Sequence, residues 1–328
     1  MAKPPRFVPR DTTRRRMSIY IAVGAFVAVD ILLVALALGS HQVGAEAGAP
    51  RIIPNVAAPA GTSTPTVSPS SAPAPAAAAD AVLPLPPTRL LGAVDENTAW
   101  RAVTGACPAT PASPELTTDG GATWKTTDAS GPAEVTALQR LMVTSERVVE
   151  MVGLTEADCA PEFVKTFVGG DNYSSYPSKI DGSWYVDPAD RATVHGPAGD
   201  TTAPCDAVVT LAVRDDESAA ALCADGQLFA TTDAAATWSE PNSAPGVVSV
   251  TAAEGGYLAA AVGTVDCAGV QIMTVTSALA PGPVGCYLSI VSPATLSGNV
   301  AVSVTAGSMW LWAGDSLARS LDGGATWE

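Results

Sequence analysis

The chain contains little histidine and little aromatic side chain. Of 328 residues two are histidine, His41 and His195, and Phe, Trp and Tyr together make up 5% of the sequence. A metal site built on histidines has too few ligands to draw on, and a Ser-His-Asp triad would have to use His195. We therefore predict that the protein binds no metal and no cofactor, and we identify no catalytic residue in the sequence.

Positive charge is also scarce. The sequence has 17 Lys and Arg against 32 Asp and Glu, a net charge of −15. Six basic and two acidic residues precede residue 40, so the remainder holds 11 basic and 30 acidic residues, a net −19. Such an acidic surface argues against nucleic acids and anionic surfaces as partners.

The cysteines show no Cys-x-x-Cys spacing, and none precedes Cys107. This pattern argues against a redox or metal motif and excludes a lipoprotein anchor. Six cysteines in the acidic part indicate an oxidising compartment and three disulfides, for which sequence alone allows 15 pairings. The candidates are Cys107, Cys159, Cys205, Cys223, Cys267 and Cys286.

The N-terminal region resembles a membrane anchor. Residues 1–16 are basic, residues 17–39 are apolar apart from Asp30, and no Lys or Arg follows until Arg51. We predict one transmembrane helix over 17–39, with the N-terminus in the cytoplasm and the rest outside the cytoplasmic membrane. A cleaved signal peptide with its site at residues 44–47 is the alternative; the length of the apolar run favours the uncleaved anchor. Asp30 costs about 2.5–3.5 kcal/mol on insertion, and is either tolerated or contacts a partner helix.

Residues 40–87 are rich in Pro, Ala, Ser and Thr and lack the apolar content to fold. We predict a disordered linker that spaces the anchor from a folded domain at 88–328.

An eight-residue motif occurs three times in that domain, at 117–124, 231–238 and 320–327. Its pattern is Ser/Thr-x-Asp-x-Gly-x-Thr-Trp, with Ala235 in place of the glycine in the second copy. The Asp accepts backbone hydrogen bonds in a hairpin turn, the Gly supplies a positive φ, and the Trp packs on a neighbouring sheet. Ala235 should therefore be strained. The defining residues, which we expect to be structural, are Thr117, Asp119, Gly121, Thr123, Trp124, Thr231, Asp233, Thr237, Trp238, Ser320, Asp322, Gly324, Thr326 and Trp327.

The motif resembles the Asp-box, or bacterial neuraminidase repeat, of sialidase-like and VPS10-like β-propellers. The resemblance implies an all-β propeller with the boxes on its outer rim, away from any active site. Aligned strand-turn-strand patterns give units at 88–131, 132–204, 205–243, 244–292 and 293–328. We expect about five four-stranded blades, each with the motif's Trp in its fourth strand. The second unit keeps a damaged box at 180–184.

Ring closure in this interpretation involves the strand near residues 89–94. An open β-sandwich or a β-solenoid is the alternative fold. The blade interpretation favours the local disulfides Cys205–Cys223 and Cys267–Cys286, and a bridge between blades one and two from Cys107 to Cys159.

The resemblance also implies what a sialidase would need: three arginines on the substrate carboxylate, a Tyr nucleophile activated by Glu, and an acidic acid/base residue. At least three arginines would then have to converge on the central axis. The candidates there are Arg89, Arg101, Arg140, Arg147, Arg191, Arg214 and Arg319. A long tyrosine-rich segment could instead be a binding loop or an ordinary exposed loop; its residues are Asn172, Tyr173, Tyr176 and Tyr185.

From these features we expect a membrane-anchored, non-enzymatic propeller that acts as a protein- or glycan-binding scaffold. The alternatives are a sialidase-type glycoside hydrolase and an assembly factor for an envelope or membrane protein complex.

Overall fold

The computed structural model describes residues 82–328. The predicted cytoplasmic arm, transmembrane helix and most of the predicted linker, all within residues 1–81, lie outside the described residues. From residue 82 onward, no helix has the length and apolar character needed to cross a membrane.

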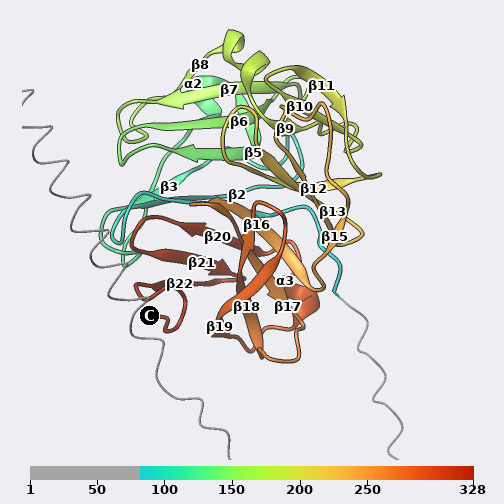
Figure 1. The fold of residues 1–328 in the computed structure, drawn as a ribbon. Helices are drawn as coiled ribbons and strands as arrows, with labels where there is room; N and C mark the ends of the chain where they lie inside the picture. The colour runs from blue at the N-terminus through green and yellow to red at the C-terminus, as the bar shows by residue number, and fades with distance from the viewer. Residues whose placement is uncertain (1–81) are drawn as a thin grey trace, which may run out of the picture. The chain divides into compact units, whose positions relative to one another are not determined.

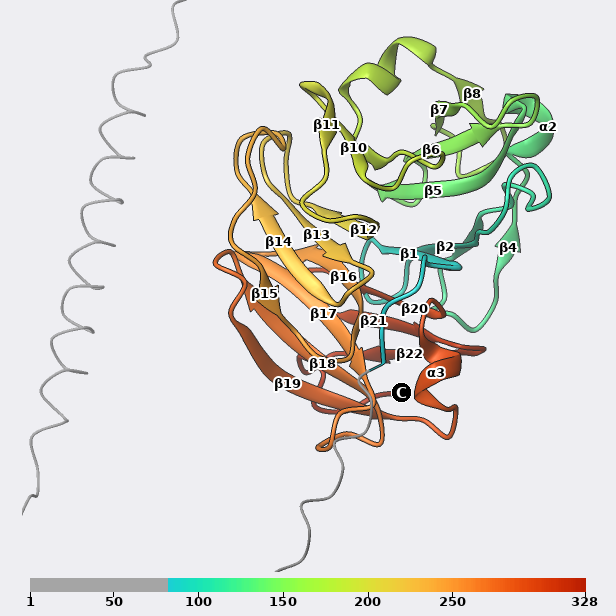
Figure 2. The same ribbon diagram turned by 90° about the vertical axis from the view of Figure 1, so that its right-hand side faces the viewer.

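Six antiparallel sheets follow one another around a closed ring, so the protein is an all-β propeller (Figures 1 and 2). Blade 1 comprises β1 (Arg89–Ala93), β2 (Ala99–Val103), β3 (Glu115–Thr117) and β4 (Lys125–Thr126). Blade 2 comprises β5 (Val135–Val143), β6 (Val149–Thr155), β7 (Pro161–Thr166) and β8 (Ser174–Ser175). Blade 3 comprises β9 (Tyr185–Val186), β10 (Thr193–Gly196) and β11 (Gly199–Thr202).

The other three blades continue the ring. Blade 4 comprises β12 (Val208–Val213), β13 (Ala219–Cys223), β14 (Gln227–Thr231) and β15 (Asn242–Ser243). Blade 5 comprises β16 (Val247–Ala253), β17 (Gly256–Val262), β18 (Gly269–Thr276) and β19 (Pro281–Leu288). Blade 6 comprises β20 (Val300–Val304), β21 (Met309–Ala313) and β22 (Ser316–Ser320). The innermost strands β1, β5, β9, β12, β16 and β20 contact their neighbours in that order around the ring.

The prediction of five blades is wrong, because the unit at 132–204 contains two blades. Its second half folds as a separate sheet, in which β10 pairs with both β9 and β11. Residues 180–184 form no repeat turn: they run from the 3-10 helix η1 (Pro177–Gly182) into β9. Trp124 and Trp238 precede the fourth strands β4 and β15 rather than lying in them, and the sheet of blade 6, which contains the third repeat turn, has three strands.

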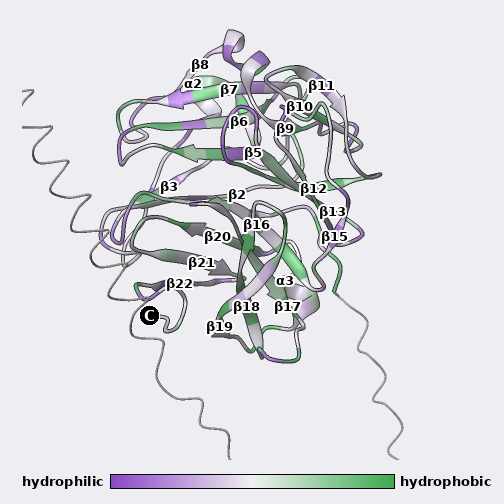
Figure 3. Ribbon diagram, in the orientation of Figure 1, coloured by the Kyte–Doolittle hydropathy of each residue, from purple (hydrophilic) through white to green (hydrophobic). Residues whose placement is uncertain are grey.

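The core lies between blades and is built from small and branched apolar residues. Every residue of β13 and of β17 is buried, so these second strands are covered on both faces. Alanines fill much of both strands, which lets neighbouring sheets approach closely. Apolar residues follow the strands and hydrophilic residues gather in the turns (Figure 3).

The three motif copies form the same hydrogen-bonded turn, which we call the repeat turn. In the first copy Asp119 accepts from the Thr123 amide at 2.9 Å and from the Thr123 hydroxyl at 2.6 Å, while the Thr117 hydroxyl accepts from the Gly121 amide at 2.9 Å. The indole N–H of Trp124 donates to the Gly121 carbonyl at 3.1 Å. These bonds satisfy the backbone of a turn that has no strand partner.

The second copy keeps the backbone geometry of this turn although alanines occupy the two glycine positions. Ala234 and Ala235 both have positive φ, 57° and 68°, as the substituted glycine predicted. The indole N–H of Trp238 is buried and has no hydrogen-bond partner, whereas its counterparts Trp124 and Trp327 each have one. The copy in which alanines replace both glycines is therefore also the copy whose buried indole donor has no partner.

Two further blades keep only the hydroxyl of the repeat turn. The Thr166 hydroxyl accepts from the Gly170 amide at 3.1 Å, and the Thr276 hydroxyl accepts from the Ala280 amide at 3.1 Å. The Asp position is Val168 in one and Ala278 in the other. Five of the six blades therefore contain this turn. The sequence motif identifies it in three of them.

Each repeat turn packs against the preceding blade. A Cβ added at Gly121 would lie 2.7 Å from Leu317 of blade 6, and one at Gly170 would lie 2.4 Å from Thr127, which follows β4 of blade 1. Leu279 of blade 5 is buried in the same cluster as Leu222 of blade 4. Ala235, in the repeat turn of blade 4, is likewise buried in a cluster that contains residues of blade 3. Each repeat turn therefore packs between its own blade and the preceding blade.

The ring closes between blades 6 and 1 without a shared strand. The strand near residues 89–94 does lie at the closure, but as the inner strand of blade 1 beside β20 (Figure 2). The Ala93 amide donates to the Ser303 hydroxyl at 2.9 Å, and the Trp310 indole donates to the Asp95 carbonyl at 3.0 Å. The Arg101 guanidinium stacks over rings from both blades, so side chains seal the seam.

All three predicted disulfides are present. Cys107–Cys159 joins the β2–β3 loop of blade 1 to the β6–β7 turn of blade 2. Cys205–Cys223 lies within blade 4, and Cys267–Cys286 lies within blade 5.

Acid is expected to destabilise the ring through its repeat turns. Hydrogen bonds from Thr123 and Thr326 hold the pKa of Asp119 and of Asp322 at about 2, below the ordinary 3.8. Because these folded-state pKa values are depressed, the stabilisation is complete above pH about 4 and is lost as the pH falls toward about 2. The double variant Asp119→Asn/Asp322→Asn should therefore show a shallower fall of the thermal midpoint over this window than the wild type.

The matched control is Asp216→Asn, in the β12–β13 turn. It should keep the wild-type acid profile. A double variant with an unchanged profile would assign the acid sensitivity to other carboxyl groups.

Candidate functional site

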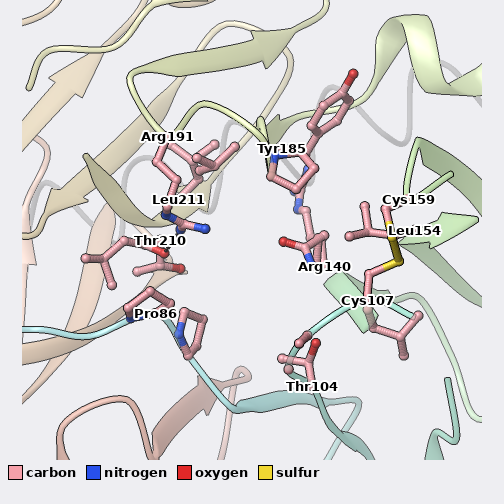
Figure 4. A pocket seen from close by; sticks show the side chains of 18 of the residues that line it. Pro86, Thr104, Cys107, Arg140, Leu154, Cys159, Tyr185, Arg191, Thr210 and Leu211 are labelled. Atoms are coloured by element: carbon pink, nitrogen blue, oxygen red, sulfur yellow. Dashed lines mark hydrogen bonds between the residues drawn. A yellow bond between two sulfur atoms is a disulfide. The ribbon is translucent and has the colours of Figure 1, made fainter. Parts of the chain in front are cut away.

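A large cavity lies beside the inner strands β1, β5 and β12. Its volume is about 520 Å³, and it is lined by residues of blades 1 to 4 (Figure 4). It adjoins the central channel of the ring, a second cavity of about 370 Å³ lined by β1, β5, β12, β16 and β20. Gln139, Arg140 and Thr210 line both. We call the larger one the mouth cavity.

Arg140 reaches the mouth cavity because β5 is irregular. The register of β5 against β6 shifts between Thr136 and Arg140, and Ala137 has a φ of 40°. One Arg140 Nη1 hydrogen bond goes to the Trp184 carbonyl at 3.3 Å. Burial lowers the pKa of Arg140 to about 10, because a desolvated guanidinium favours its neutral form more than a hydrated one.

Arg191 reaches the same cavity from the β9–β10 loop. Its Nε donates to the Val208 carbonyl and its Nη2 to the Val209 carbonyl, both at 2.7 Å, at the start of β12. Burial lowers its pKa as well. Neither Arg191 nor Arg140 takes part in an ion pair within residues 82–328. The cavity is therefore lined by two cations that form no ion pair within these residues (Figure 4).

Asp158 is the one acidic residue that lines the mouth cavity. Its carboxylate accepts from the Thr155 hydroxyl and from the Ala160 amide within its own turn. These hydrogen bonds lower its pKa, so it stays ionised and is no proton donor at neutral pH.

Tyr185 is the one tyrosine of the predicted binding loop that lines the cavity. Burial, with the nearby carboxylates of Asp200, Asp187 and Asp181, raises its pKa to about 12. A tyrosine nucleophile requires the opposite shift. Its ring stacks on the imidazole of His195, with centroids 4.5 Å apart.

His195 is held by oxygen atoms on both sides. Its Nδ1 lies 2.6 Å from Asp200 Oδ1 and its Nε2 lies 3.3 Å from the Asp181 carbonyl. In the described part of the chain no Ser or Thr hydroxyl hydrogen-bonds to it, so the triad that would need His195 does not form there. That part also contains no cluster of acidic, His or Cys side chains able to hold a metal ion.

The rest of the predicted loop serves other parts of blade 2. Tyr173 is buried in the core, and its hydroxyl lies 2.6 Å from that of Thr127. Tyr176 packs edge-on against Phe167, and Asn172 is exposed. The structure therefore brings one residue of the predicted loop to the cavity and leaves three away from it.

Two arginines, not three, share the mouth cavity. Arg89 lines the adjoining channel, but its Nε donates to the Gly314 carbonyl and its guanidinium stacks over Trp312. Of the remaining candidates, Arg101, Arg214 and Arg319 stack on aromatic rings and Arg147 is exposed. The convergence that a sialidase would need is absent from residues 82–328.

No family model and no curated protein matches this sequence. Solved structures match at low identity. YCF48 from Cyanidioschyzon merolae is 16% identical, with 75% of this chain and 86% of that chain covered and a TM-score of 0.38. A YCF48 structure bound to a D1 peptide is 18% identical, with 75% and 82% covered and a TM-score of 0.28. The GH74 xyloglucanase from Xanthomonas campestris is 13% identical, with 76% and 46% covered and a TM-score of 0.39.

Proposed function

We propose that this chain is a non-enzymatic binding protein, an Asp-box β-propeller whose mouth cavity receives a group from a protein or glycan partner. The observation that carries the proposal is the pair Arg140 and Arg191, two cations at one cavity that form no ion pair within residues 82–328. Both side chains are half-buried, and a partly desolvated charge is costly unless paired, so a partner that supplies a negative charge gains affinity there.

The proposal places the propeller outside the cytoplasmic membrane, tethered by the apolar segment at 17–39 with the N-terminus inside. Three disulfides support an oxidising compartment, because such bonds persist outside the cytosol. The basic arm before the apolar segment supports the orientation.

A hydrolase fits this cavity poorly. Acid/base catalysis needs a group that gives or takes a proton near neutral pH, and a retaining sialidase needs an activated tyrosine. Asp158 is held ionised by its own turn and Tyr185 is held protonated. The cavity is equipped to hold an anion rather than to cleave a bond.

The test is capture of partners by the full-length chain from its own membranes, compared with Ala189→Trp. Ala189 is exposed and lines the cavity, so the indole should fill the entrance and leave both arginines in place. We expect a partner that the wild type retains and Ala189→Trp loses, and no hydrolysis of a fluorogenic sialoside by either. Sialoside turnover that is lost in Tyr185→Phe would replace the proposal with the hydrolase.

A further inference from the structure

We infer that the mouth cavity binds an organic acid with an apolar body, whose carboxylate lies between Arg140 and Arg191. The inference rests on the proposed function, because it names the chemistry of the group that the cavity receives.

The two guanidinium groups have hydrogen-bond donors to spare. A guanidinium carries five N–H donors, of which Arg140 uses one in the protein and Arg191 uses two. The protein bonds of Arg191 fix its plane against the start of β12, so its remaining donors are oriented before a ligand arrives. Planar, fixed guanidinium groups match a carboxylate, which accepts two parallel N–H bonds.

Charge favours one negative charge over several. The chain after residue 39 has a net charge of −19, and its field opposes multiply charged anions. Asp158, ionised at the same cavity, adds to that opposition. An anion with a single negative charge can contact both arginines, and the acidic protein repels it less than it repels an anion with several charges.

The walls around the arginines require an apolar body. The cavity volume of about 520 Å³ is far larger than a carboxylate and falls within the range of roughly 300–1,000 Å³ of small-molecule sites. Apolar side chains form most of the wall: Pro86, Pro87, Leu138, Leu154, Val209 and Leu211. Burial of an apolar chain against them adds affinity that a bare anion lacks.

The same walls disfavour a sugar. A sugar ring needs several polar partners for its hydroxyl groups, and the uncharged polar side chains lining the cavity are Thr88, Thr104, Gln139, Tyr185 and Thr210. Gln139 already donates its amide to the Ala137 carbonyl at 2.9 Å. The apolar acid therefore fits the lining better than a glycan.

The experiment titrates hexanoate into the purified full-length chain by calorimetry. Acetate, hexan-1-ol and inorganic phosphate serve as comparison ligands, since each lacks either the apolar body or the carboxylate. We expect saturable binding of hexanoate that is stronger than that of all three. Arg140→Gln and Arg191→Gln should each weaken it about tenfold or more, as expected for a lost hydrogen bond to a charged group. Exposed Arg147→Gln should leave it unchanged.

Hexan-1-ol or phosphate binding as tightly as hexanoate overturns the inference, as does retained hexanoate affinity in both cavity variants. If an arginine variant fails to fold, Ala189→Trp still tests the site, because it keeps both cations and should abolish hexanoate binding. If the wild type captures a partner that Ala189→Trp loses, but does not bind hexanoate, this inference is wrong and the proposed function still stands. Displacement of a captured partner by hexanoate assigns the acid group to that partner, and undisturbed capture assigns the site to a free acid.

Discussion

Adding one methyl group at Gly285 is expected to destabilise the propeller by about 3 kcal/mol, at the upper end for overpacking in a tight interface. Gly285 lies in β19, the outer strand of blade 5, against the repeat turn of blade 6. A Cβ there would lie 1.9 Å from the Gly324 carbonyl oxygen and 2.6 Å from its carbonyl carbon. Both neighbours are backbone, so relief requires blades 5 and 6 to separate. Denaturant unfolding of the full-length Gly285→Ala variant measures the loss.

The control is Gly282→Ala in the same strand. A Cβ at Gly282 meets only the Thr274 hydroxyl, at 3.4 Å, so the variant should stay within about 1 kcal/mol of the wild type. Equal losses of unfolding free energy in the two variants would show that the effect belongs to strand β19 itself and not to its contact with the repeat turn of blade 6.

Trp310→Ala should cost about 3–5 kcal/mol, because it empties a fully buried site at the seam of the ring. The Trp310 indole donates across the seam to the Asp95 carbonyl at 3.0 Å, and its ring lies beside the repeat turn of blade 1, near Gly121. Unfolding free energy from denaturant titration is the measurement.

Two comparisons separate the causes of that loss. Trp310→Phe keeps most of the buried ring but leaves the Asp95 carbonyl without its donor, so about 1–3 kcal/mol should be lost. Trp327→Ala removes the half-buried Trp of the blade 6 turn, which lies outside the seam, and should cost less than Trp310→Ala. The reverse order would place the sensitive contact in the repeat turn instead of the seam.

The propeller and the disulfide pairs were predictable from sequence because they rest on repeated local patterns. Three turns that share the same Asp-centred hydrogen bonds fix the spacing of blades, and equivalent blade positions then pair Cys107 with Cys159. The blade count was not predictable, because blade 3 has no repeat turn and its inner strand β9 is two residues long. The turn at Thr166 was missed because a hydroxyl and two glycines, without the Asp, are too common to form a pattern.

The mouth cavity was only partly predictable. Gln139 and Arg140 interrupt an otherwise apolar strand, which is a signal of a functional or strained position that could have been used. Arg191 stands in a polar loop with no local signal, and only the ring brings it beside Arg140. The tyrosine-rich segment was misleading because its polar neighbours conceal that Tyr173 packs in the core.

The direction in which the repeat turns pack has a consequence for the nascent chain. Each turn covers the blade made before it, as Gly324 covers β19 and Leu279 enters the core of blade 4. A blade emerging from the ribosome therefore exposes apolar surface until the next blade is synthesised. Blade 1 differs from the others, because its own turn packs on blade 6, the last blade to be synthesised, beside Leu317 and Trp310. The first blade made must wait for the last, so the apolar surface between blades 1 and 6 is the last to be covered.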